Sequence, residues 1–202
     1  MISEQFFNKW IWSLLLITPI CGLIFDEPYY ITLATKVIIL GIAGVGLNLA
    51  LGYCGLISFG HAAFFGIGGY VTAIMSYHAI NNEILFSWPF DIFGSSEMLI
   101  IWPLAILISA FLSLIIGLLS LRTSGVYFIM ITLAFAQMLY FFSISWPNYG
   151  GEDGLSIYMR NSLPMLNTMN PLTFYLICLS WLSTSIYAVS YTHLTLPTMV
   201  QV

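Results

Sequence analysis

The stretch of chain from Leu47 to Tyr70 constrains the fold more than any other part of the sequence. It is apolar enough to lie in a bilayer, yet nine of the chain's 16 glycines fall between Gly41 and Gly69. Glycine is useful where backbones approach closely or leave helical geometry, and a lipid-facing helix needs neither. We therefore expect two hydrophobic segments that meet at a broken, glycine-lined turn. Such a break survives in a membrane only when protein buries it or when it lines a cavity.

Composition places the chain in the membrane. Sixty per cent of its residues are hydrophobic and 6% are charged, whereas soluble domains carry about a quarter charged residues. The fold class is therefore all-α, a polytopic integral membrane helical bundle with a broken or re-entrant segment between the second and third spans. A spanning helix needs about 20 apolar residues. The apolar runs predict one transmembrane domain over residues 1–189 with about six spans, at 6–25, 29–51, 59–80, 98–120, 125–146 and 171–189.

The sequence lacks the residues that several classes of function require. The four Lys and Arg residues are scattered, which excludes a basic nucleic-acid-binding patch. The three cysteines (Cys21, Cys54 and Cys178) stand in apolar runs without metal-ligand spacing, so we expect small buried hydrophobes and no metal site or cofactor. His61 and His78 are 17 residues apart, about 25 Å along one helix, too far to share a haem iron.

No convincing enzyme active site emerges from the sequence. The phosphate-binding loop of ATPases, the HExxH zinc motif and the GxSxG nucleophile turn are all missing. Ser58 and His61 would form a nucleophile–base pair in a membrane-embedded enzyme, but nothing else supports that alternative. The sequence also shows no ring of charges or carbonyls of the kind that a selective channel requires, which argues against a channel. His61 either lines a polar path through the bundle or makes only a structural hydrogen bond to a backbone carbonyl.

Three stretches carry a resemblance to a known family. They are GLNLALGYCGLISFGHAAFFGIGGY (46–70), LRTSGVYFIMITLAFAQM (121–138) and GGEDGLS (150–156). In the same order they resemble LivM-type permeases, the membrane subunits of ATP-binding-cassette (ABC) importers for branched-chain amino acids. The resemblance implies a transport subunit in a bacterial inner membrane that moves Leu, Ile or Val. Urea or short-amide permeases of the same superfamily remain an alternative.

The resemblance also implies partners. They are a LivH-like permease, two cytoplasmic ATPase subunits that hydrolyse ATP, and an extracytoplasmic substrate-binding protein. A broken helix supplies free N–H and C=O groups for a zwitterionic substrate. The candidate path residues are Gly52, Gly55, Ser58, Gly60, His61 and Gly66. Glu152 and Asp153 either help to dock the binding protein or belong only to a tight turn.

Charge and the C-terminal residues complete the expectations. Lys9 and Arg122 favour a cytoplasmic N-terminus, although Arg160 then falls outside. From Ser190 the chain is polar and Thr-rich, and SYTHLTLPT resembles translated sequencing-adapter sequence. We therefore expect residues 190–202 to be a tail foreign to the family. We expect the native sequence to continue from near Ala188 into further spans and a segment that docks the ATPase.

Overall fold

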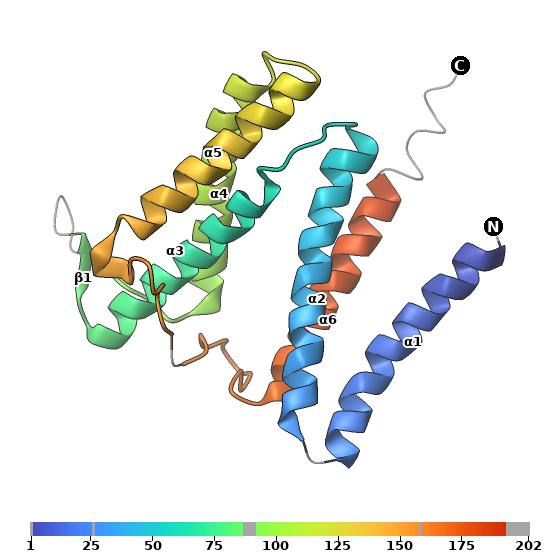
Figure 1. The fold of residues 1–202 in the computed structure, drawn as a ribbon. Helices are drawn as coiled ribbons and strands as arrows, with labels where there is room; N and C mark the ends of the chain where they lie inside the picture. Colours follow the sequence, from blue (N-terminus) through green and yellow to red (C-terminus); the bar gives the residue numbers. More distant parts are fainter. Residues whose placement is uncertain (1, 26, 87–91, 158, 193–202) are drawn as a thin grey trace. The chain divides into compact units, whose positions relative to one another are not determined.

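Helices dominate the structure, a computed structural model that describes residues 2–25, 27–86, 92–157 and 159–192 (Figure 1). Within those residues, five helices are long and apolar enough to cross a bilayer. The predicted all-α, polytopic fold class is confirmed, and the chain is a multi-pass membrane protein. It divides into two compact units, one of residues 1–49 with 167–202 and one of residues 50–166. We describe each unit by itself.

The first unit contains three helices: α1 (Ile2–Ile24), α2 (Pro28–Asn48) and α6 (Pro171–Ser190). Proline opens both α2 and α6, where its missing N–H costs nothing because the first turn has no internal acceptor. Asn170 caps α6 by accepting a 3.0 Å hydrogen bond from the Leu172 amide. Residues 193–202, most of the predicted foreign tail, lie outside the described residues.

The core of the first unit forms where α2 meets its neighbours. Ile38 and Tyr175 are almost fully buried, and α2 and α6 run side by side (Figure 1). On the other side, Gly22 of α1 leaves room for Ile31, whose side chain occupies the place a Cβ would take. The buried cluster comprises Leu15, Ile31, Ala34, Ile38, Tyr175, Cys178 and Leu182.

A proline inside α1 explains a hydrogen bond between distant parts of this unit. Pro19 lacks an N–H, so the carbonyl of Leu15, four residues earlier, loses its partner within the helix. The hydroxyl of Tyr175 donates to that carbonyl, and the Thr18 hydroxyl donates to it at 3.0 Å. Tyr175 is 0% exposed, so its own hydroxyl also needs this acceptor. The pair therefore connects α1 to α6.

The second unit is built on three further helices: α3 (His61–Asn81), α4 (Met98–Ser120) and α5 (Val126–Ile144). The π-helix η1 (Leu49–Tyr53) precedes α3, and the 3-10 helix η2 (Pro147–Tyr149) follows α5. The strands β1 (Ile84–Phe86) and β2 (Ile92–Phe93) lie between α3 and α4. The two strands pair antiparallel. Along α3 the main packing partner is α4, with α5 touching both.

Much of the apolar surface of these helices is exposed. In α4, Ile106, Leu107 and Phe111 are each more than 60% exposed. A soluble domain would bury such a face, but lipid tails solvate it as well as a protein core does. The exposure is therefore what a membrane bundle of few helices requires. The predicted spans at 59–80, 98–120 and 125–146 coincide closely with α3, α4 and α5, although which segments cross the bilayer stays a prediction.

Candidate functional site

The predicted break between the second and third hydrophobic segments is present. After η1 the chain leaves helical geometry and becomes helical again only at His61. Two local hydrogen bonds organise this break. The Leu56 amide donates to the Ala50 carbonyl at 3.0 Å, and the Gly60 amide donates to Ser58 Oγ at 3.2 Å. The segment between η1 and α3 is thus an ordered part of the second unit.

Gly60 is the point where the break meets α5. It is buried, and a Cβ at this position would lie 2.9 Å from the Thr132 carbonyl oxygen and 3.3 Å from Thr132 Cβ. Only glycine allows so close an approach without displacement. Thr132 stands six residues after Val126, so the contact lies about 9 Å along α5 from its start. The first turn of α3 therefore begins beside the interior of α5 rather than level with its end.

The N-terminus of α3 is polar and uncompensated by its own side chains. Gly60 occupies the N-cap position, no side chain caps the helix, and the first turn contains no acidic residue. The Ala63 amide turns back to the Gly60 carbonyl at 3.1 Å. The positive end of the helix dipole is therefore not offset by a side-chain cap or by an acidic residue of the first turn. His61, the first residue of α3, is partly exposed and has an interaction within the fold.

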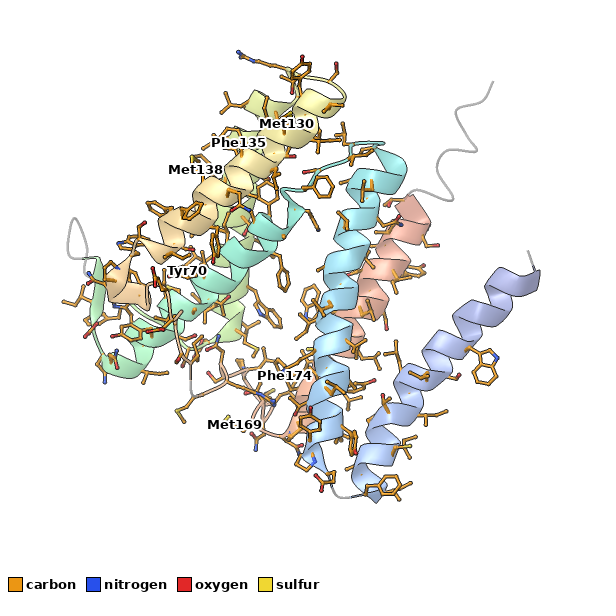
Figure 2. The ribbon with its side chains drawn as sticks, viewed as in Figure 1. Tyr70, Met130, Phe135, Met138, Met169 and Phe174 are labelled. Atoms are coloured by element: carbon orange, nitrogen blue, oxygen red, sulfur yellow. The ribbon has the colours of Figure 1, made fainter. Side chains whose placement is uncertain are left out.

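A cavity of about 10 Å³ lies beneath the break, between α3, α4 and α5. That is room for about one water molecule and not for an amino acid. Phe135, labelled on α5 in Figure 2, is one of its walls. The remaining lining residues are Ser58, Gly60, Ala63, Phe64, Ile116, Thr132, Ala136 and Leu139. The helices are thus closed on one another at this level.

The candidate path residues separate into two groups. Ser58, Gly60 and His61 come together at the start of α3. Gly52 and Gly55 are exposed in the connecting segment, and Gly66 is exposed on α3 with nothing within 4 Å of where its Cβ would be. The part of each in transport stays a prediction. Sequence reasoning missed Thr132, although a threonine within an uncharged apolar run was a usable signal.

The opposite end of α3 holds the loop that carries Glu152 and Asp153. Tyr70, labelled in Figure 2, donates its hydroxyl to the Tyr149 carbonyl at 2.9 Å. Further along α3, Ser76 Oγ lies 2.6 Å from Asn161 Oδ1. Glu152 and Asp153 are both exposed in a turn that begins at Gly150.

Cysteines and acidic residues do not assemble a metal site within the described ranges, where no cluster of three or more His, Cys, Asp or Glu side chains occurs. Cys178 is buried in the first unit's core, as predicted. The prediction of burial was wrong for Cys21 and Cys54, which are exposed. Cys21 lies on a face of α1 that the chain leaves uncovered, and Cys54 lies in the non-helical segment after η1.

Comparison with known proteins identifies the family. A family model described as branched-chain amino acid transport system / permease component matches residues 29–193. The chain belongs to this permease family. Across 127 residues this permease is 28% identical to the high-affinity branched-chain amino acid transport system permease protein LivM of Salmonella typhimurium. The match covers 62% of the chain and 26% of that relative, so it spans about a quarter of the relative's length. No solved structure matches.

Proposed function

We propose that this permease is a membrane subunit of an ABC importer that moves leucine, isoleucine and valine across a bacterial inner membrane. In this role it is not an enzyme. A LivH-like permease completes the path, two cytoplasmic ATPase subunits hydrolyse ATP, and an extracytoplasmic binding protein delivers the substrate. The family match supports this assignment for the chain.

One observation carries the proposed mechanism. The uncapped N-terminus of α3 begins beside Thr132, inside the length of α5. A free amino acid has a carboxylate, and helix N-termini at membrane depth favour such groups through N–H donors and the dipole. The surrounding apolar side chains suit an aliphatic substrate through dispersion contacts. In this proposal Ser58, Gly60 and His61 lie next to the substrate when the helices separate. Gly52, Gly55 and Gly66 line the path on either side.

Orientation follows from the same scheme. With a cytoplasmic N-terminus, the break and Arg122 face the cytoplasm, and the loop between α5 and α6 faces outward. Glu152 and Asp153 then meet the binding protein, because both are exposed on that loop. Exposed carboxylates attract a basic patch on a partner and raise the association rate.

The test is uptake of radiolabelled leucine by the assembled importer in proteoliposomes. We expect uptake that requires ATP inside the vesicle and that isoleucine and valine inhibit, with urea inactive. Inhibition by urea without inhibition by isoleucine or valine would instead assign a urea permease, and uptake without ATP would assign a channel.

His61 gives a residue-level test of the path. We expect His61→Ala and His61→Gln to reduce leucine uptake at unchanged expression, because both remove the imidazole from the first turn of α3. As a control, Asn81→Gln changes an exposed polar residue at the other end of α3. Normal uptake by both His61 variants would remove His61 from the path and leave the family assignment intact.

A further inference from the structure

Tyr149 is held on α3 at both its backbone and its side chain. Its carbonyl accepts the 2.9 Å hydrogen bond from Tyr70 Oη, and its hydroxyl lies 3.0 Å from His78 Nε2. The rings of Tyr77 and Trp146 meet the Tyr149 ring edge-on, with centroids 6.4 Å and 5.2 Å away. Two hydrogen bonds and two ring contacts therefore hold Tyr149 in place, which makes it an anchor point of this segment.

The histidine in this anchor has no other hydrogen bond to its ring within the described part of the chain. His78 is 8% exposed, and its Nδ1 is buried without a hydrogen-bond partner there. Glu83 Oε2 lies 3.9 Å from Nδ1, beyond hydrogen-bond range, and that carboxylate side chain is 56% exposed. A buried imidazole that leaves one nitrogen unsatisfied is costly. The hydrogen bond between Nε2 and the Tyr149 hydroxyl therefore satisfies the other ring nitrogen of this buried histidine.

The turn that follows Tyr149 is compact. Gly150 has φ 88°, and a Cβ there would overlap the Gly154 carbonyl. The Asp153 amide donates to the Gly150 carbonyl at 3.1 Å, and the Gly151 amide donates to the Trp146 carbonyl at 3.2 Å. Little freedom remains between the anchor and the acidic residues, so the place of Tyr149 determines where Glu152 and Asp153 lie.

We propose that Tyr149 is a positioning residue for binding-protein docking. Held by Tyr70 and His78, it presents Glu152 and Asp153 in a fixed arrangement on α3. An ordered surface loses less conformational entropy on association than a mobile one, so the anchor favours docking without touching the partner. This inference rests on the proposed function, in which the acidic turn meets the binding protein.

The experiment titrates the binding protein against the reconstituted importer and separates half-saturation from the maximal uptake rate. We expect Tyr149→Phe, which removes only the hydroxyl, to raise the half-saturating concentration about two- to fivefold, with the maximal rate unchanged. Tyr70→Phe is expected to do the same from the other side of the anchor. Tyr140→Phe is the control, because that ring is 58% exposed on α5.

A second background distinguishes this inference from the docking proposal. The double variant Glu152→Gln with Asp153→Asn is expected by itself to raise the half-saturating concentration of the binding protein. An unchanged concentration would overturn docking at the turn. In that background Tyr149→Phe is expected to have no further effect, because it acts through the two carboxylates. An equal effect of Tyr149→Phe in both backgrounds, a lower maximal rate alone, or no effect of Tyr149→Phe and Tyr70→Phe would overturn the positioning role.

Discussion

The hydrogen bond from Tyr175 to Leu15 offers a sharp test of how the first unit is held together. Pro19 has no N–H to donate to the Leu15 carbonyl, and the Tyr175 hydroxyl donates to that carbonyl instead. We expect Tyr175→Phe to leave this carbonyl with the Thr18 hydroxyl alone, at 3.0 Å. Hydrogen bonds between membrane helices contribute about 0.6 kcal/mol on average and about 1.7 at most. Because the site is fully buried, we expect a loss of about 1 kcal/mol.

A double-mutant cycle isolates this contribution. Pro19→Ala returns an N–H to α1, so the Leu15 carbonyl regains a partner within the helix. In the Pro19→Ala background, Tyr175→Phe is expected to cost less than about 0.3 kcal/mol, giving a coupling of about 1 kcal/mol between the two positions. The cycle also cancels whatever else the loss of proline does to α1.

The assay is reversible unfolding of the purified chain in mixed micelles as the mole fraction of SDS rises, followed by circular dichroism and tryptophan fluorescence. Tyr29→Phe is the matched control, since it removes a phenol hydroxyl from a ring of the same unit that is 67% exposed. The reasoning is refuted if Tyr175→Phe costs the same free energy with Pro19 as with alanine at that position. It is equally refuted if Tyr29→Phe costs as much as Tyr175→Phe.

Three glycine substitutions test the second unit. We expect Gly60→Ala to cost about 1–3 kcal/mol in the same unfolding assay, because its Cβ would press on the Thr132 carbonyl. Gly66→Ala, with open space around its Cβ, is expected to be neutral or to stabilise by up to about 1 kcal/mol. Gly150→Ala is expected to open the acidic turn and to accelerate proteolysis after Glu152 at least about fivefold, since strain of about 1–3 kcal/mol is introduced there.

Each of these substitutions has an outcome that would contradict its reasoning. Equal costs for Gly60→Ala and Gly66→Ala would mean that the close approach to α5 is not what makes glycine necessary at position 60. For the turn, Gly117→Ala in α4 is the control, as nothing lies within 4 Å of its Cβ. Unchanged cleavage of the Gly150→Ala variant would show that the turn is not held as tightly as its geometry indicates.

The sequence by itself determined the helical, membrane-embedded character of this permease. Long apolar runs place the chain in a lipid bilayer. There the backbone N–H and C=O groups of each spanning segment must be hydrogen-bonded within the protein, which favours helices. The position of the break was also local information, because glycines and Ser58 concentrate between two apolar runs. The same local reasoning shows Pro19 removing a partner from the carbonyl four residues before it.

Only the tertiary structure decided which groups meet. The donor to Leu15 is Tyr175, 160 positions away in the sequence, and the neighbour that makes glycine necessary at position 60 is Thr132 on another helix. The anchor of the acidic turn joins Tyr70 and His78 of α3 to Tyr149 of η2. Hydropathy is a sum over residues that are neighbours in the chain, so it can be calculated from the sequence alone. The rotation of one helix relative to another depends on packing between residues far apart in the sequence, so it cannot be predicted from local periodicity.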